Sequence, residues 1–197
     1  SDKDKETIIR QLVPILNLNY AYLRDRLYRK KSFIWLMRKI TPEQSQAIKK
    51  LNIKGLGFLK ESKRTYPNAY LACHVIGFAG LDNTGLEGIE LYYDKYLKGQ
   101  GGWALFLRDA RQRRLDLYEK MVYPRDGYDL VLTINEVIQY IAERELDKVF
   151  KTYHAKGASI VVMDPHTGAI LALANRPKFD LNEYGNISMD QMRNRAI

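Results

Sequence analysis

The sequence lacks a second cysteine, and it lacks any apolar run of the ~20 residues that a membrane-spanning helix requires. The one cysteine, Cys73, excludes an intrachain disulfide and a metal cluster built from cysteines. It lies in the apolar stretch 71–76, which favours a buried and unreactive thiol. The three histidines, His74, His154 and His166, do not have the spacing of metal ligands. We therefore predict that the chain binds no metal ion and no cofactor.

What the sequence does contain suffices for one large or two small folded domains. Of its 197 residues, 46% are apolar and 28% are charged, which is the composition of a folded chain and not of a disordered tail. The net charge of +9 is concentrated in residues 21–64, where thirteen Lys and Arg stand against three acidic residues. Such a basic block can contact phospholipid head groups, nucleic acid or an acidic partner. It can equally be a solvated helical surface.

The periodicity of the apolar residues predicts an α+β fold. Helices are expected at 6–18 with an interruption at Pro14, at 19–29, from Thr41 to about Gly55, just after 83–88, and at 135–153. Strands are expected at 33–36, 57–64, 75–78, 103–107 paired with 114–118, 130–134, 158–163 and 169–174. No internal repeat or low-complexity tract interrupts this series.

Two of the expected helices have clear start signals. Thr41-Pro42-Glu43-Gln44 can form a reciprocal capping box with proline in the first turn. The later helix can be capped by Asn135 or by Thr133. Its expected apolar stripe consists of Ile138, Ile141, Ala142, Leu146, Val149, Phe150 and Tyr153.

The connector with the least expected secondary structure is Tyr123-Pro-Arg-Asp-Gly127, because it contains turn-forming residues and shows no apolar periodicity. We place a domain boundary there, with a first domain at 1–123 and a second at 128–197.

Two short motifs in the middle of the chain combine charge with tight turns: Arg64-Thr-Tyr66-Pro67-Asn68 and Gly85-Leu-Glu-Gly88-Ile-Glu90. Arg64 offers a planar fork for a carboxylate, and Glu90 is its expected partner. Pro67 and the two glycines would form the turns that bring them together. An ion pair of this kind orients segments, so we predict a structural and not a catalytic role.

The end of the chain reads as a β-hairpin followed by a specific tail. Asp164 can bond back to the chain, and Gly168 accepts a positive φ, so both suit the turn between the two expected strands. The sequence continues with Asn175-Arg-Pro-Lys-Phe-Asp-Leu-Asn182 and ends with an Arg-Asn-Arg-Ala-Ile stretch that contains Asn194 and Arg195.

Together these stretches resemble the class B penicillin-binding proteins: a pedestal, or dimerisation, domain followed by the start of the penicillin-binding transpeptidase domain. The two middle motifs resemble the pedestal patterns Arg-x-Tyr-Pro-x-Gly and Gly-x-x-Gly-x-Glu. The resemblance covers about residues 51–197. It departs from the pattern at Ala69 and Gln112, where glycine is usual, and the first pedestal motif is missing. If position 69 needs a positive φ, alanine is strained there.

The resemblance implies a protein of peptidoglycan synthesis at the periplasmic or extracellular face of the bacterial inner membrane, closer to the division or sporulation branch. It implies a membrane anchor, which this sequence does not contain, and contacts with peptidoglycan, a SEDS-type glycosyltransferase and divisome proteins. We expect the sequence to be a piece of a longer protein. Because the sheet would lack its remaining strands, we also expect residues 158–197 to be partly disordered or atypically packed.

The chemistry of that family requires a Ser-x-x-Lys motif, together with Ser-x-Asn and Lys-Thr-Gly. None of the six serines has lysine at the third following position, and the other two motifs are missing as well. We therefore predict that this chain alone is inactive and that its work is positioning and partner docking. Two alternatives remain open: a basic nucleic-acid-binding module, which no recognised motif supports, and a degenerate wall-binding protein.

Overall fold

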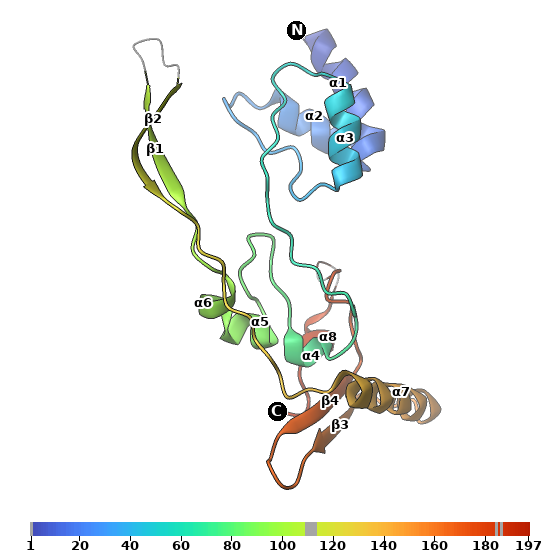
Figure 1. Ribbon diagram of the computed structural model, residues 1–197. Helices are drawn as coiled ribbons and strands as arrows, with labels where there is room; N and C mark the ends of the chain where they lie inside the picture. The colour runs from blue at the N-terminus through green and yellow to red at the C-terminus, as the bar shows by residue number, and fades with distance from the viewer. Residues whose placement is uncertain (1, 109–113, 184, 186) are drawn as a thin grey trace. The chain divides into compact units, whose positions relative to one another are not determined.

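A computed structural model describes residues 2–108, 114–183, 185 and 187–197. The chain forms two compact units, Ser1–Lys63 and Arg64–Ile197 (Figure 1). The predicted connector at 123–127 lies inside the second unit.

The first unit is helical. It consists of α1 (Asp2–Leu16), α2 (Tyr20–Tyr28) and α3 (Pro42–Lys50). Their inward faces bury a single apolar cluster of Ile9, Leu12, Leu16, Leu23 and Ile48. The capping box is confirmed, because the Thr41 side chain accepts from Gln44 N while the Gln44 side chain accepts from Thr41 N.

Three expectations for the first unit are wrong. Helix α1 continues through Pro14, which is exposed in the last turn. Helix α3 ends at Lys50 and not near Gly55, since Asn52 takes a left-handed φ of 47°. The strands expected at 33–36 and 57–64 do not form. These two segments lie near each other through the Arg38–Glu61 ion pair, 2.7 Å from Nη2 to Oε1, and Leu36 and Leu56 pack on the helical core.

In its described residues the second unit combines four short helices and one long helix with two separate two-stranded antiparallel sheets, β1–β2 and β3–β4, which confirms the α+β class (Figure 1). In chain order its elements are α4 (Cys73–Ile76), α5 (Gly88–Tyr92), α6 (Asp94–Leu97), β1 (Trp103–Arg108), β2 (Arg114–Val122), α7 (Glu136–Thr152), β3 (Ala158–Met163), β4 (Ile170–Arg176) and α8 (Met189–Met192).

Both predicted hairpins are confirmed. Strand β1 pairs with β2 from Trp103 opposite Val122 to Arg108 opposite Arg114, and the turn that contains Gln112 lies outside the described residues. Strand β3 pairs with β4 from Ala158 opposite Arg176 onward.

The predicted strand at 75–78 is instead the end of α4 and the turn after it. Ala72 precedes that helix at φ 52°, and Gly77 ends it at φ 70°. Segment 130–134 is not a strand either, but it lies along β4. Thr133 Oγ1 donates to Ile170 O at 2.7 Å, and Asn135 N donates to Leu171 O at 2.8 Å.

Helix α7 is confirmed with Asn135 as its N-cap, accepting from Val137 N and Ile138 N. Its predicted apolar stripe is only partly the buried face. Ala142 and Leu146 are buried, whereas Ile141, Val149 and Tyr153 are exposed. The buried face, which lies on β4, instead includes the polar residues Gln139 and Glu143.

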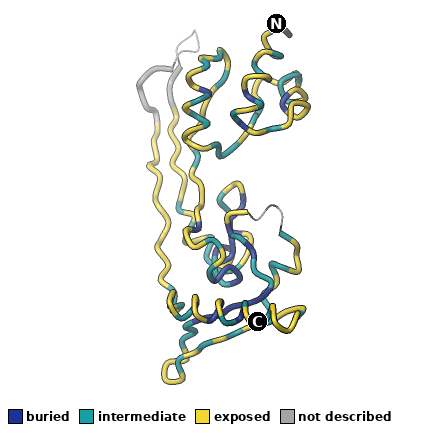
Figure 2. Tube along the Cα trace, turned by 90° about the vertical axis from the view of Figure 1, so that its right-hand side faces the viewer, coloured by how far each residue is buried: buried dark blue, intermediate teal, exposed yellow. Residues whose placement is uncertain are grey.

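Two residues of the stretch after β4 are buried in the second unit, while the expectation that residues 158–197 are partly disordered or atypically packed stays a prediction. Phe179 and Leu181 join Tyr66, Cys73 and Phe78 in one buried cluster. The buried trace in Figure 2 accordingly follows β4 and the loops around α4.

Candidate functional site

Arg64 and Glu90 form an ion pair, with 2.6 Å from Nε to Oε1. The Glu90 side chain is 7% exposed and the Arg64 side chain 51%. Burial is the largest single influence on the pKa of Arg64 and lowers it, but the hydrogen bond to Glu90, the charge of Glu90 and the contacts with Tyr66 together raise this pKa. The pair therefore joins the start of the first middle motif to helix α5.

The glycines of the second motif allow the close approach that places Glu90. A Cβ on Gly85 would lie 2.0 Å from Glu90 O. Gly88 has φ 58°, and its Cβ would lie 2.6 Å from Val75 O. Because backbone atoms cannot yield as a flexible side chain can, no larger residue fits either position.

Tyr66 ties the first motif to a distant part of the chain. Its hydroxyl accepts from Ala79 N at 2.8 Å, and burial raises the pKa of the phenol to about 12. Its main-chain N–H and carbonyl both bond to the Asn182 side chain, each at 3.0 Å. Pro67 begins the exposed turn that follows, and Ala69 O accepts from Leu181 N at 3.1 Å.

Ala69, where the family pattern has glycine, has φ 40°. The sequence analysis expects strain at position 69 if its φ is positive. Because φ is positive, the alanine is strained there.

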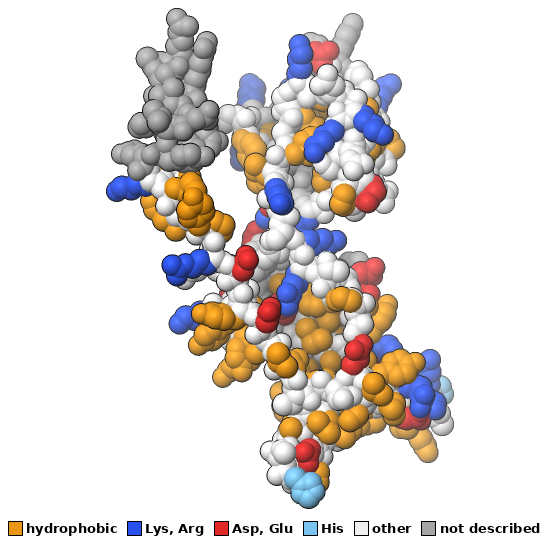
Figure 3. Space-filling model, viewed as in Figure 1, with side chains coloured by type: hydrophobic (Ala, Val, Ile, Leu, Met, Phe, Trp, Pro, Cys, Tyr) orange, Lys and Arg blue, Asp and Glu red, His pale blue; other side chains and the backbone are white. Residues whose placement is uncertain are grey.

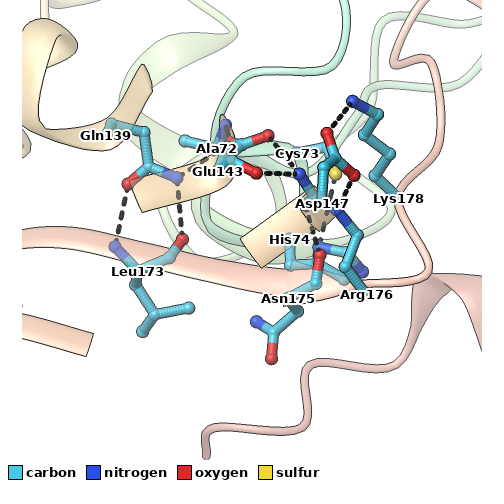
Figure 4. Close-up of polar contacts among 10 residues, drawn as sticks. All are labelled: Ala72, Cys73, His74, Gln139, Glu143, Asp147, Leu173, Asn175, Arg176 and Lys178. Atoms are coloured by element: carbon cyan, nitrogen blue, oxygen red, sulfur yellow. Dashed lines mark hydrogen bonds and ion pairs between the residues drawn. The ribbon is translucent and has the colours of Figure 1, made fainter. Parts of the chain in front are cut away.

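A second set of contacts joins α4 to α7 (Figure 4). Glu143 Oε1 accepts from Ala72 N at 2.7 Å and from Gln139 Nε2 at 2.9 Å. Gln139 in turn bonds to both main-chain groups of Leu173, so its side chain occupies the edge of β4 as a neighbouring strand would.

Arg176 is the most enclosed charge of this set, with a side chain 2% exposed (Figure 4). Its Nε donates to Asp147 at 2.6 Å, and Nη2 donates to Glu143 O at 2.8 Å. Arg176 and Lys178 hold the pKa of Asp147 down to about 2. A buried guanidinium with several acceptors fixes the orientation of the elements that carry them.

Cys73 and His74 are buried together and are not a catalytic pair. His74 Nε2 lies 2.8 Å from Gln191 O, and since a carbonyl only accepts, Nε2 donates and Nδ1 accepts from the Cys73 thiol at 3.3 Å. Burial raises the pKa of Cys73 to about 11 and lowers that of His74. The neutral thiol is a poor nucleophile.

The four residues singled out near the end of the chain lie at opposite ends of the β3–β4 hairpin. Asp164 accepts from His166 N at 2.9 Å and from Thr167 Oγ1 at 2.7 Å, which lowers its pKa, and Gly168 completes the turn at φ 73°. Asn194 and Arg195 instead bond to Asn175 at the other end of the hairpin, at 2.9 and 3.2 Å.

Sequence reasoning missed Gln139, Glu143 and Arg176. A usable signal existed, because Gln139 and Glu143 stand four residues apart within an otherwise apolar helix face. In the described residues every buried side-chain nitrogen and oxygen has a hydrogen-bond partner. No group there could hold a metal ion, and none of the helices there could cross a membrane. The arrangement can fix one segment to another, and it holds no activated nucleophile.

Comparison with known proteins agrees with this description. A family model for the penicillin-binding protein dimerisation domain matches residues 1–132, and one for the penicillin-binding protein transpeptidase domain matches residues 158–197.

Similar curated proteins include two that are named as transpeptidases and one that is named for sporulation. The probable peptidoglycan D,D-transpeptidase PenA of Neisseria meningitidis is 38% identical, stage V sporulation protein D of Bacillus subtilis is 38% identical, and the peptidoglycan D,D-transpeptidase FtsI of Escherichia coli is 34% identical. The matches cover 96%, 90% and 95% of this chain but 33%, 28% and 32% of those proteins. The chain thus spans about a third of the length of these relatives.

The solved complex between penicillin-binding protein PBP2 and MreC from Helicobacter pylori matches with a TM-score of 0.70 and 27% identity, over 97% of this chain and 39% of that one. Penicillin-binding protein 2X from Streptococcus thermophilus shares the fold, with a TM-score of 0.58 at 22% identity over 96% and 31%. The chain therefore belongs to the class B penicillin-binding proteins, as a dimerisation domain followed by the start of the transpeptidase domain.

Proposed function

We propose that this chain is the non-catalytic pedestal part of a peptidoglycan D,D-transpeptidase, acting in cell-wall synthesis and cell division by positioning the catalytic domain. The observation that carries the proposal is that the first pedestal motif and the chain just after it are bonded to the start of the transpeptidase region, while the two motifs are paired with each other. Tyr66 is bonded to Asn182, and Ala72 to Glu143, while Arg64 is paired with Glu90. The pedestal would span 1–123 and the transpeptidase start 128–197.

In this proposal Arg64, Tyr66, Pro67, Gly85, Gly88 and Glu90 are positioning residues. Asp164, Gly168, Asn194 and Arg195 shape the first hairpin of the catalytic domain. Since this sequence lacks the Ser-x-x-Lys, Ser-x-Asn and Lys-Thr-Gly motifs, we assign none of these residues a catalytic role.

The test is a chimera in which this chain replaces its aligned segment of Escherichia coli FtsI. The chimera should bind fluorescent penicillin and support growth when native FtsI is depleted. The Arg64→Ala chimera should keep penicillin labelling but support growth poorly, and Arg64→Glu combined with Glu90→Arg should restore part of the growth. Lys151→Ala, an exposed change on α7, is the matched control.

Two results would contradict the proposal. One is a chimera that accumulates normally but is not labelled by penicillin. The other is an Arg64→Ala chimera that supports growth as well as the parent.

The family and the PBP2–MreC structure also support partner docking. We propose that the protein works at the periplasmic or extracellular face of the cytoplasmic membrane, held by an anchor, beside peptidoglycan, a SEDS-type glycosyltransferase and divisome proteins. Co-purification of the chimera with these proteins tests each contact separately from penicillin labelling.

A further inference from the structure

All of the net charge of the chain lies in the first unit. Residues 1–63 contain fifteen Lys and Arg against six Asp and Glu, a balance of +9, which equals the +9 of the whole chain. In Figure 3, Lys and Arg side chains are spread over the visible face of the α1–α3 unit. The second unit is neutral in sum. A separate fold unit that carries all of the excess charge is suited to an anionic surface.

The linker between α2 and α3 adds exposed apolar side chains to this charge. We call residues 30–37 the basic-aromatic segment. Lys30 and Lys31 of this segment are exposed, and their side chains have no hydrogen-bonding or ionic partner among the described residues. Phe33 is 61% exposed, and Trp35 and Met37 are each 37% exposed. Water is a poor environment for three such side chains in one short segment.

Contacts within the first unit keep these apolar side chains exposed. The Arg26 guanidinium donates to the Trp35 main-chain carbonyl, and Leu36 packs on the helical core. Phe33 and Trp35 lie edge to face, with 5.2 Å between ring centroids and 85° between ring planes. These contacts hold the aromatic pair on the surface beside the two lysines.

We propose that the basic-aromatic segment binds the anionic surface of a lipid bilayer. Lys30 and Lys31 contact phosphate head groups, while Phe33, Trp35 and Met37 enter the boundary between head groups and acyl chains. Aromatic side chains with lysine beside them are favoured at that depth, and two basic residues add electrostatic attraction to anionic lipid. The inference rests on the proposed function only for the presence of a membrane beside the protein.

The ring contacts of the first unit favour a bilayer over nucleic acid. Binding of single strands requires open aromatic faces on which bases stack. Here Arg38 lies over Trp35 at 5.6 Å, Arg26 over Tyr22 at 4.8 Å and Lys49 over Phe58 at 5.4 Å. One face of each of these rings already has a cation over it, which leaves less open ring surface for bases, whereas a bilayer needs only charge and apolar side chains at the surface.

The experiment measures binding of the full chain to phosphatidylglycerol-rich vesicles, to phosphatidylcholine vesicles, and to single- and double-stranded DNA at one salt concentration. We expect binding to the anionic vesicles alone. Lys30→Glu with Lys31→Glu should weaken it by at least about twentyfold, since each basic residue near the surface contributes about fivefold. Lys151→Glu with Lys156→Glu, two exposed lysines of the second unit, changes the net charge equally and should leave binding within about twofold.

Tryptophan fluorescence reports insertion into the bilayer and requires only single Trp→Phe substitutions. The chain has two tryptophans, Trp35 and Trp103. Trp103→Phe should keep a blue shift on anionic vesicles, and Trp35→Phe should lose it.

Three results would overturn the inference: equal loss of binding in both charge-reversed variants, tighter binding to DNA than to anionic vesicles, or a blue shift that survives Trp35→Phe. Thermal melting of each variant identifies any that has lost its fold. These binding experiments use neither penicillin labelling nor growth. A failure of the bilayer proposal is therefore distinguishable from a failure of the pedestal proposal.

Discussion

The side-chain amide of Gln139 is bonded to both main-chain groups of Leu173: Leu173 N donates to Oε1 at 2.8 Å, and Nε2 donates to Leu173 O at 3.0 Å. Gln139 is fully buried. One side chain on α7 therefore replaces a neighbouring strand at the edge of β4, and it fixes the helix at one position along that strand.

Gln139→Met tests that attachment. Methionine preserves the volume but leaves the N–H and the carbonyl of Leu173 unpaired in a buried place. We expect the free energy of unfolding to fall by roughly 2–4 kcal/mol, because each unsatisfied main-chain group costs about 1–3 kcal/mol. Urea denaturation followed by circular dichroism measures it. Lys148→Met, an exposed change on the same helix, should stay within about 0.5 kcal/mol, and equal stability of both variants would contradict the edge role.

A second prediction concerns acid stability through Asp147. Its pKa is about 2 in the folded protein, against an ordinary value of 3.8, because Arg176 first and Lys178 second favour the charged carboxylate. A lowered pKa contributes stability that is fully present above about pH 4 and is lost as the pH falls toward 2.

Asp147→Asn should therefore destabilise the protein at pH 7 by at most about 2 kcal/mol, and the difference from the parent should shrink between pH 4 and pH 2. Urea denaturation of both proteins at several pH values gives this difference. A deficit that does not change with pH would show that Asp147 contributes by packing and not by charge.

Ala69 provides a stabilising prediction. It has φ 40°, a conformation that costs an alanine about 1–2 kcal/mol and that glycine adopts freely. Ala69→Gly should raise the free energy of unfolding by about 0.5–1 kcal/mol, after the extra entropy of the unfolded glycine is included. Ala104→Gly, at an exposed site in β1, is the matched control and should be neutral or destabilising. A melting temperature that falls in Ala69→Gly would exclude strain at this turn.

Local signals explain which parts of the fold could be predicted from sequence. Thr41 and Asn135 are N-cap residues whose side chains bond to the first turn of the helix, so the sequence predicts the N-termini of α3 and α7 correctly. Arg64 and Glu90 were paired correctly because turn-forming residues flank both of them. The strand expected at 75–78 was wrong, because the β-branched Val75 and Ile76 favour a strand locally, whereas the tertiary structure uses them in α4.

The buried polar contacts could not be predicted, because their partners are main-chain groups far away in sequence. Glu143 bonds to Ala72 N, and Gln139 to Leu173. Every residue carries nearly the same main-chain groups, so the residue type does not indicate which of these groups bonds to a distant side chain. A polar residue on an apolar helix face predicts only that some such partner exists.

The last prediction concerns Gly88, on which the position of Glu90 depends. Alanine there would be strained at φ 58°, and its Cβ would lie 2.6 Å from Val75 O. We expect Gly88→Ala to lower the free energy of unfolding by roughly 3–5 kcal/mol, because backbone must move to admit the methyl group. Gly101→Ala is the matched control, since no atom beyond its chain neighbours lies within 4 Å of the added Cβ.

Removing the Arg64–Glu90 pair by Arg64→Ala should add little further loss of stability in the Gly88→Ala background, because the displaced helix α5 no longer places Glu90 beside Arg64. Full additivity of the two changes in urea denaturation would show instead that the glycine and the ion pair act independently.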